Sequence, residues 1–335
     1  MNPAKQTVTS KDVAKLAGVS QSTVSRVFVP GSSVSEKTKQ KVFEAAKALN
    51  YRPNAFARSL TTNESKLIGL VFPDADYPIH MKTLQLISSE LQKQGYSAVL
   101  IPWQVDDEDN HSIPNIFQYR VDGVIAASAT FNKSLYEECE EFNIPIVQYA
   151  RVVEGTKSSY VISDNYEAGQ QAAQLLHKSG VKNAVYLTGE VPTFTNDERQ
   201  SGFCSEFEDL TSNTPRIVEA TYDYASSLDK IREILADKNR PEAVFCATDN
   251  LAMAVMDIAR IECGLSIPQD LQVIGFDNIP QTEWLSYQLT TFRQDFRRLA
   301  RECVKIIVDQ INTKNGSLVK MMVPVKLIER QTTKA

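Results

Sequence analysis

The chain contains two regions with different patterns of apolar and polar positions. Within the first 50 residues, apolar side chains recur at spacings of three and four, as on one face of an α-helix; Val13, Leu16 and Ala17 form one such set. From residue 67 onward, short continuous apolar runs such as 67–72 alternate with helical patterns. Such runs are typical of strands buried on both faces, so this region is predicted to form parallel sheets covered by helices.

The first helix of the N-terminal region has recognisable ends. Thr9 followed three residues later by Asp12 resembles a capping box, and Gly18 suits the left-handed residue that ends a helix. Ser20 can then cap a second helix over residues 21–28.

The first two helices are separated by only about three residues, which predicts a helix-turn-helix. Ala14 allows the helices to cross closely, Gly18 makes the turn, and Val24 packs the second helix back on the first. A third helix is expected from Ser35 to about Leu49.

Charge separates the N-terminal region from the rest of the chain. Residues 1–60 contain ten lysines and arginines against three acidic residues, whereas the whole chain carries a net charge of −5. A basic head on an acidic body is typical of a module that binds phosphate groups. Charge alone would equally fit a solvated basic face, so the interpretation depends on the helix-turn-helix.

The second helix is the candidate for base recognition, because the N-terminal residues of such a helix enter the major groove of DNA. Gln21, Ser22 and Arg26 lie opposite its apolar face. Arginine can bind guanine, and glutamine can bind adenine, through paired hydrogen bonds. Nearby hydroxyls suit phosphate, although Ser20 and Thr23 could instead only cap and solvate the helix. The expected DNA contacts of the head are Thr9, Ser20, Gln21, Ser22, Thr23, Ser25, Arg26, Ser35, Thr38 and Tyr51.

A short segment connects this head to the body. Pro53 can start a helix over 54–60, but so short a helix is unstable in water without a partner. The alternative is a plain linker with Leu60 packed on the body.

The body contains two similar series of strands and helices. Strands are expected at 67–72, 97–101, 123–127 and 145–149, and again at 183–187, 217–222, 243–247 and 271–276. Helices are expected between them, followed by a helix over 296–311 and a final strand.

In open α/β sheets a ligand binds beyond the carboxyl ends of the strands. Carboxylates and aromatic rings follow several of the predicted strands, and such groups suit a sugar or polyol, because carboxylates accept hydroxyl hydrogens and rings stack on C–H faces. Alternatively, Asp249 and Asp277 could be helix N-caps, and Trp284 could either line the cleft or only pack. The expected ligand contacts at strand ends are Asp74, Tyr77, Ser128, Tyr149, Tyr222, Asp249 and Asp277.

Several stretches of the head resemble the LacI/GalR (lactose-repressor) family of transcription regulators. The resemblance is carried by 11–20 and 22–27, and it continues through 34–38, 51–55 and 57–60. One departure is Val29, where that family usually has asparagine.

The resemblance implies a fold, a partner and further site residues. The fold would be α/β, with an all-α helix-turn-helix head and two doubly wound parallel-sheet subdomains similar to type I periplasmic binding proteins. Two hinge helices of a homodimer would meet in the minor groove of a palindromic operator, with Leu60 as the apolar wedge and Asn54 and Ala57 as further contacts. The implied domains are 1–52 for the head, 53–62 for the hinge and 63–335 for the body, whose subdomains span about 63–163 with 293–322 and about 164–292 with 323–335.

The same resemblance implies how the effector would be held. Arg199 corresponds to the family's effector-contacting arginine, Tyr222 to its aromatic stacker and Asp277 to its hydroxyl-binding aspartate. Thr195 and Asn196 lie in the loop that tunes specificity, next to Thr193, and Ala150 replaces a frequent aspartate. The expected function is a sequence-specific repressor whose operator affinity depends on a small molecule, most simply a sugar.

Other functions find less support in the sequence. An enzyme on the same body would be expected to carry a nucleotide-binding or nucleophile motif, and G-x-G-x-x-G, G-x-x-x-x-G-K-[ST] and G-x-S-x-G are all absent. A transport binding protein would need a signal peptide, whereas residues 1–10 are polar, so a cytoplasmic protein without membrane contact is expected. Five scattered cysteines and three histidines predict neither disulfides nor a metal site, the acidic run 106–109 fits a helix start, and no cofactor is expected.

Overall fold

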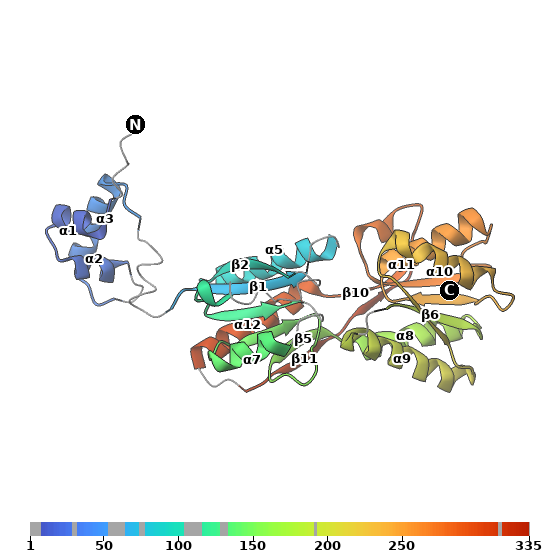
Figure 1. Cartoon of the computed structure of the whole chain (residues 1–335). Helices are drawn as coiled ribbons and strands as arrows, with labels where there is room; N and C mark the ends of the chain where they lie inside the picture. Colours follow the sequence, from blue (N-terminus) through green and yellow to red (C-terminus); the bar gives the residue numbers. More distant parts are fainter. Residues whose placement is uncertain are drawn as a thin grey trace. The chain divides into compact units, whose positions relative to one another are not determined.

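The computed structural model describes residues 8–28, 32–52, 64–73, 78–103, 116–127, 133–190, 193–313 and 317–334. The chain divides into two compact units, residues 1–66 and 67–335, which we call the head and the body (Figure 1). Among the helices within these described ranges, none is both long and apolar enough to cross a membrane.

The head is built from three helices, whose ends follow the local capping signals. They are α1 (Ser10–Ala17), α2 (Gln21–Val27) and α3 (Glu36–Ala48). The Asp12 carboxylate accepts hydrogen bonds from the Thr9 backbone N–H (2.9 Å) and hydroxyl (2.7 Å). Gly18 has a φ of 67°, the left-handed conformation expected of it. Ser20 and Ser35 each accept a bond from the backbone N–H three residues later.

The head has a small core at the meeting point of the three helices. Its buried side chains are Val13, Ala14, Val24, Val27, Val42, Ala45 and Ala46. Leu16, which the spacing placed on the apolar face of α1, is 56% exposed. At about 100° per residue, a face centred on Val13, Ala14 and Ala17 turns Leu16 toward the rim, so that part of the prediction was wrong.

The first sheet of the body has six parallel strands in the order β11-β5-β4-β3-β1-β2, and we call it and its helices the first subdomain. The order reverses at β1, where Leu67 pairs with Ser97 of β2 and Ile68 with Gly123 of β3. Its strands are β1 (Leu67–Pro73), β2 (Ser97–Trp103), β3 (Gly123–Ala126), β4 (Ile146–Tyr149), β5 (Ser159–Ser163) and β11 (Lys320–Val323).

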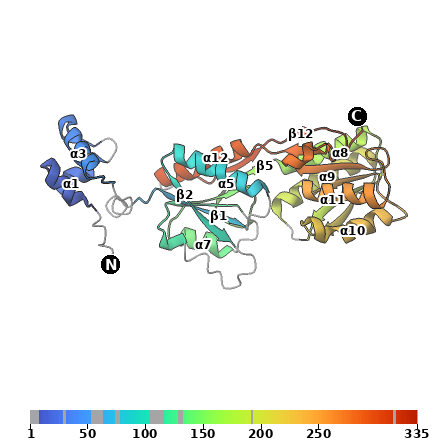
Figure 2. The ribbon, with the colours of Figure 1, turned by 90° about the horizontal axis from the view of Figure 1, so that it is seen from above.

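Helices cover both faces of this sheet. On one face, α5 (Pro78–Lys93) and α12 (Phe296–Thr313) pack side chains such as Ile87 and Ile307 against the strands. On the other, α7 (Lys133–Glu141) contributes Leu135 to a second cluster (Figure 2). The sheet is therefore doubly wound, as its continuous apolar strands require.

The second sheet has the order β12-β10-β9-β8-β6-β7, and we call it and its helices the second subdomain. All neighbouring strands are parallel except β12, which runs antiparallel to β10 with Thr291 opposite Ile328. Its strands are β6 (Ala184–Gly189), β7 (Arg216–Ala220), β8 (Ala243–Cys246), β9 (Gln272–Asp277), β10 (Thr290–Arg293) and β12 (Lys326–Ile328).

This sheet also lies between two helical layers (Figure 1). The layers are α8 (Asn165–Lys178) with α9 (Phe194–Thr211), and α10 (Tyr224–Ala236) with α11 (Asp249–Asp257). A π-helical turn (Ile258–Glu262) extends α11, and a short 3-10 helix (Pro280–Glu283) follows β9. The helical head with two doubly wound sheets confirms the predicted fold class.

The chain passes between the two sheets three times. It leaves the first sheet after β5, returns from β10 to α12, and passes again from β11 to β12. The Asp164 backbone N–H donates to the Val323 carbonyl (2.8 Å), which joins the first and third passages side by side.

Candidate DNA-binding head and effector site

The outer face of α2 carries the side chains expected to read DNA. Gln21, Ser22, Ser25 and Arg26 are exposed, whereas Val24 is buried. The Arg26 Nε donates to the Ser22 carbonyl (3.3 Å), which holds the guanidinium along its own helix. These side chains therefore share one accessible face, as a recognition helix needs.

The short hydroxyl side chains of the head are engaged locally. The Ser20 hydroxyl caps α2 by accepting from the Thr23 backbone N–H (3.1 Å) and lies 2.8 Å from the hydroxyls of Ser22 and Thr23. Thr38 forms the equivalent pair with Ser35 at 2.9 Å. Capping thus occurs at both Ser20 and Ser35, and the Ser20 hydroxyl also exchanges hydrogen bonds with two neighbouring hydroxyls.

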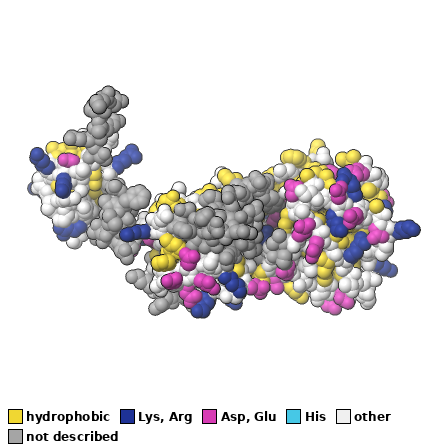
Figure 3. Space-filling model, viewed as in Figure 1, with side chains coloured by type: hydrophobic (Ala, Val, Ile, Leu, Met, Phe, Trp, Pro, Cys, Tyr) yellow, Lys and Arg dark blue, Asp and Glu magenta, His cyan; other side chains and the backbone are white. Residues whose placement is uncertain are grey.

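Positive charge is spread over the surface of the head. Figure 3 shows Lys and Arg side chains on several of its sides, whereas Asp and Glu are frequent on the body. Tyr51 is half-buried, and its ring contacts Phe28 with centroids 6.1 Å apart, so it also supports the core of the head. The hinge residues Asn54, Ala57 and Leu60, as well as Val29, lie outside the described residues.

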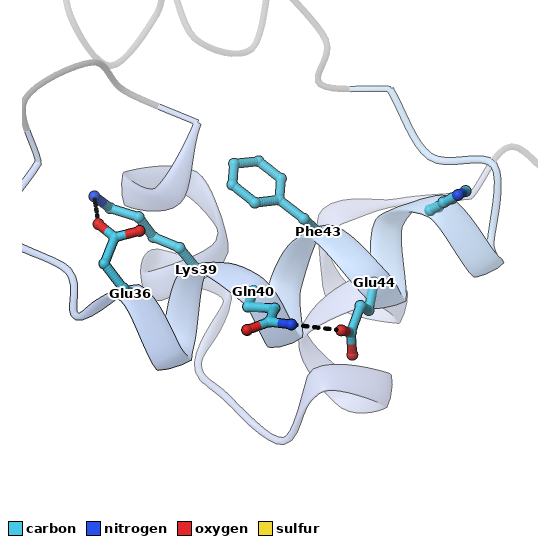
Figure 4. A pocket seen from close by; sticks show the side chains of 6 residues that line it. Glu36, Lys39, Gln40, Phe43 and Glu44 are labelled. Carbon is cyan, nitrogen blue, oxygen red and sulfur yellow. Dashed lines mark hydrogen bonds and ion pairs between the residues drawn. The ribbon is translucent and has the colours of Figure 1, made fainter.

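A shallow hollow is lined by exposed side chains of α3 (Figure 4). Phe43 lines it, and its ring packs edge-on against Phe28 with centroids 5.5 Å apart. Two hydrogen-bonded pairs flank the ring, Lys39 with Glu36 (2.6 Å) and Gln40 with Glu44 (3.2 Å). The third helix therefore presents balanced charge around one aromatic ring.

In the body, most residues expected to bind a ligand were predicted because they follow the carboxyl ends of strands. Both sheets reverse their strand order, at β1 and at β6, and ligands of such sheets bind at the carboxyl ends beside the reversal. Asp74, Tyr77 and Ser128, which belong to these ends in the first sheet, lie outside the described residues. The ends of β6, β8 and β9 are described, and Arg199 lies among them.

Arg199 is 7% exposed and is held by neutral acceptors. Its Nη2 and Nε donate to the Asn165 Oδ1 (2.7 and 3.3 Å), and its Nη1 donates to the Ala247 carbonyl at the end of β8 (2.6 Å). The guanidinium carbon lies 3.3 Å from the centre of the Phe276 ring, a cation–π contact. Burial lowers the pKa of Arg199, while the charges of Tyr186, Asp277 and Tyr222 oppose that shift. Asp277 directly follows Phe276, whose ring the guanidinium contacts.

Two glycines set the position of Arg199 by letting α8 and α9 touch through their backbones. A Cβ on Gly202 would lie 2.1 Å from the Tyr166 carbonyl oxygen, and a Cβ on Gly169 would lie 2.2 Å from that of Arg199 itself. The helices can therefore cross at this distance only where both residues lack side chains.

Asp277 ends β9 and connects the two subdomains. It is 8% exposed and has a φ of 118°, a conformation that aspartate tolerates better than most residues. Its Oδ1 accepts from the Gln294 Nε2 (2.6 Å), and the Gln294 Oε1 accepts from the Ser163 hydroxyl (2.6 Å). A hydrogen-bonded chain thus runs from the end of β9 to the end of β5.

Tyr222 lies against the end of β6. A Cβ on Gly189 would lie 2.2 Å from the Tyr222 ring, so the ring packs directly on the glycine backbone. Tyr222 is only partly buried, which leaves part of its surface open to a ligand. Tyr222, Arg199 and Asp277 therefore lie at the carboxyl ends of β6, β8 and β9, respectively.

Asp249 is enclosed by other residues of the second subdomain and is not exposed to a ligand. It is fully buried; its Oδ1 accepts from the Thr291 hydroxyl (2.6 Å) and its Oδ2 from the Ile279 N–H (2.9 Å). The helix cap that could have been its role belongs to Thr248, which accepts from the Leu251 N–H (3.3 Å). Gly275 makes room for the carboxylate, because a Cβ there would lie 2.3 Å from Oδ1. We therefore assign Asp249 to holding α11, β10 and the segment after β9 together.

This buried carboxyl group should make stability depend on pH. Burial, and secondly the charge of Asp277, raise the pKa of Asp249 from 3.8 to about 7. The folded protein then binds a proton that the unfolded chain has released, so stability falls as pH rises from about 4 to 7. We expect the melting temperature of the wild type, relative to Asp249→Asn, to rise as pH is lowered from about 8 to 5.

The control is Asp223→Asn at an exposed helix cap. Hydrogen bonds to the Ser226 backbone and side chain lower the pKa of Asp223, so this group stays ionised over the same pH range. Differential scanning calorimetry of the three proteins checks the prediction. The prediction is contradicted if the difference in melting temperature between the wild type and Asp249→Asn does not change with pH.

The other expected ligand contacts are buried inside the subdomains. Tyr149 is 2% exposed within the first subdomain's core, where burial raises its pKa. Thr195 and Asn196 are each 4% exposed in the first turn of α9, and the Asn196 Oδ1 accepts from the Tyr186 hydroxyl (2.9 Å). Trp284 is 57% exposed.

Sequence reasoning missed two residues of this site. Asn165 and Gln294 follow β5 and β10, and both bind a residue that was predicted, Arg199 and Asp277. The rule of searching strand ends would have found them, had the ends of these two strands been recognised. No group of three or more potential metal ligands occurs within the described ranges; the run 106–109 lies outside them.

Comparison with known proteins identifies the family of the chain. Residues 9–54 match the family described as "Bacterial regulatory proteins, lacI family", and residues 173–333 match a "Periplasmic binding protein-like domain". The chain is 32% identical over 329 residues to the HTH-type transcriptional repressor PurR of Yersinia enterocolitica, covering 97% of this chain and 96% of that protein. The chain belongs to the LacI family. It is also 30% identical to PurR of Mannheimia succiniciproducens, covering 97% of this chain and 98% of that protein.

Solved structures of LacI-family proteins have the same architecture. The Lac repressor dimer bound to operator and the anti-inducer ONPF matches with a TM-score of 0.86 and 26% identity, covering 98% of this chain and all of that one. The complex of the transcriptional regulator CelR with cellobiose matches with a TM-score of 0.72 and 26% identity, covering 97% and 99%. These relatives are DNA-binding regulators rather than enzymes, and this LacI-family chain is a transcription regulator of the same kind.

Proposed function

We propose that this LacI-family protein is a dimeric repressor that binds a palindromic operator through α2 and changes its affinity when a small molecule occupies the junction of the two subdomains. The observation that carries the proposal is the grouping of Arg199, Asp277 and Tyr222 beside the passages between the two sheets. A ligand that contacts these residues would shift one subdomain against the other and so act on the head.

Each of these three residues would make a different kind of contact with the effector. Arg199 donates to ligand oxygens, Asp277 accepts from hydroxyls, and Tyr222 stacks on a C–H face. The hinge, residues 53–62, would form its helix only when two copies meet on the minor groove, with Asn54, Ala57 and Leu60 in contact with DNA. The CelR complex with cellobiose supports a sugar-like ligand for this class of body.

An exposed apolar surface on the second subdomain fits a second copy of the chain. Ile261 is 79% exposed, Leu285 96% and Trp284 57%. The Arg260 guanidinium binds the Ser286 carbonyl, which brings the two segments side by side. Exposed apolar side chains on neighbouring segments are typical of interaction sites, and the Lac repressor is a dimer on its operator.

The proposal is tested by selecting duplexes from a random library with the full-length protein and measuring binding by fluorescence anisotropy with and without metabolites. We expect a palindrome to be enriched, and its affinity to fall steeply with salt because lysines and arginines displace counterions. At least one metabolite should change that affinity. Equal binding of all duplexes at physiological salt, with every metabolite tried, would refute the proposed function.

Arg26→Ala should weaken binding to the selected operator by about 1–3 kcal/mol and relax the preference at one base pair, because a guanidinium with paired hydrogen bonds to guanine is lost. The matched control is Lys47→Ala, which removes an equal charge from the exposed side of α3. Lys47→Ala should weaken binding to all duplexes equally or leave it unchanged. Anisotropy on the operator and its single-base variants checks this, and unchanged discrimination in Arg26→Ala would show that another residue reads the base.

A further inference from the structure

Arg151 occupies an unusual position where the two subdomains meet. It follows β4 after Ala150, whose φ of 57° turns the chain away from the sheet. Its Nη1 donates to the Thr193 hydroxyl (2.8 Å), which belongs to the other subdomain. The side chain is half-buried, so its guanidinium is held at the junction and is still accessible.

In the described part of the chain, the hydrogen-bond partner of the Arg151 guanidinium is neutral. Within the described part of the chain, no Asp or Glu lies within 4.0 Å of its guanidinium, and Thr193 is its hydrogen-bond partner. Arg199 follows Thr193 by six residues on α9, and after burial the charge of Arg151 is a minor cause of the lowered pKa of Arg199. Of the described acids, Asp249 is enclosed by Thr291 and Ile279, and Asp277 accepts from Gln294. Asp197 and Glu198 lie near the start of α9.

The helix that Arg151 reaches makes its charge still less favourable. Thr193 is the N-cap of α9, an 18-residue helix, and its hydroxyl also accepts from the Asn196 backbone N–H (3.3 Å). The N-terminus of a helix carries partial positive charge, so a cation placed there is repelled, whereas an anion is stabilised. Among the described residues, Arg151, Arg199 and the N-terminus of α9 therefore contribute positive charge to this region, whereas Asp277 and Asp197, in the first turn of α9, contribute negative charge.

We propose that the effector of this protein carries an anionic group, a phosphate ester or a carboxylate, which Arg151 binds at the start of α9. The inference rests on the proposed function, in which the effector occupies the junction. Arg151 is then the residue that distinguishes a charged ligand from its neutral counterpart. Arg199, Asp277 and Tyr222 hold the polyhydroxyl part of the ligand. Arginine suits this role because its planar fork can donate two hydrogen bonds to a carboxylate or phosphate while a third nitrogen keeps the contact with Thr193.

The experiment compares neutral compounds with their anionic counterparts at constant ionic strength. The panel contains neutral sugars and polyols, each with its phosphate monoester and its sugar acid (glucose, glucose phosphate and gluconate, for example), and inorganic phosphate alone. Thermal shift ranks them, and isothermal titration calorimetry measures Kd for the best of each kind. The proteins are the wild type, Arg151→Gln, Arg151→Lys and the control Arg240→Gln, which removes an exposed arginine from the second subdomain.

We expect an anionic member to bind the wild type more tightly than its neutral counterpart. Arg151→Gln should weaken the binding of the anionic compound by about 10- to 100-fold, because a charge-assisted hydrogen bond is lost, and should leave the binding of the neutral compound unchanged. Arg151→Lys should restore part of the affinity, and Arg240→Gln should match the wild type. Without ligand, Arg151→Gln should melt no lower than the wild type, since it removes a cation from a helix N-terminus.

Each contrary result has a distinct meaning. If neutral members bind as tightly as the anionic ones, or if Arg151→Gln keeps the preference for the anion, the inference is overturned and the proposed function stands. If inorganic phosphate alone gives the same stabilisation, the site holds an adventitious ion only, and the inference again fails. If no member binds and none changes operator affinity, the proposed function fails together with the inference.

Discussion

Asp277→Ala and Asp277→Asn are expected to abolish the effector response while the ligand-free protein keeps its operator affinity. In the proposed function Asp277 accepts hydrogen bonds from ligand hydroxyls. Its charge also opposes the lowering of the Arg199 pKa, and its carboxylate accepts from Gln294 in the passage after β10. A hydrogen bond to a charged group contributes about 1.5–3 kcal/mol, so its loss should weaken effector binding by about 10- to 150-fold. The asparagine variant suits the unusual backbone at φ 118° and so separates chemistry from strain.

The measurement is operator affinity by anisotropy across an effector titration. Asp209→Ala, which removes an exposed carboxylate from α9, is the control and should respond as the wild type does. If Asp277→Asn still responds at wild-type effector concentrations, the effector site does not include this residue.

Gly202→Ala should destabilise the body, against the usual effect of such a change. Replacing glycine by alanine inside a helix normally stabilises it by up to about 1 kcal/mol. Here the new Cβ would lie 2.1 Å from the Tyr166 carbonyl oxygen, so α8 and α9 must separate. Overpacking of this kind costs about 1–3 kcal/mol, and each kcal/mol lowers the melting temperature of a domain of this size by about 2–4 °C.

The same separation should move Arg199 away from Asn165 and weaken the effector response. Ser201→Ala is the control, because it places alanine at the neighbouring exposed position of α9 without adding a Cβ against α8. Calorimetry and effector titration of both variants check the prediction. A Gly202→Ala protein that is more stable than the wild type would show that the two helices do not rely on backbone contact.

Sequence reasoning succeeded where the physical signal is local. The helices of the head could be predicted because Thr9, Gly18, Ser20 and Ser35 act on backbone groups within three or four residues. Strands buried on both faces also carry their own signal, as in β1, because every position must be apolar. Local spacing was less reliable for a single side chain such as Leu16, whose burial depends on the exact centre of the helical face.

The candidate site was only partly predictable, because its geometry depends on strands that pair over long distances. β10 is defined by β9 on one side and β12 on the other, and β5 by β4 and β11. The residues that follow them, Gln294 and Asn165, therefore carry no local mark of their position. The environment of Asp249 is likewise created by Thr291, Ile279 and Gly275.

By itself, the sequence determined the helix-turn-helix head, the alternation of strands and helices, and the polar residues at several strand ends, since these depend on periodicity and on neighbours a few residues away. Only the tertiary structure decided which of those polar residues meet. It brought Arg199, Asp277 and Tyr222 together, enclosed Asp249, and placed Arg151 at the start of α9. The reason is that burial and electrostatic surroundings are set by whatever the folded chain packs against a residue, and these partners come from segments 30 to 50 residues or more away.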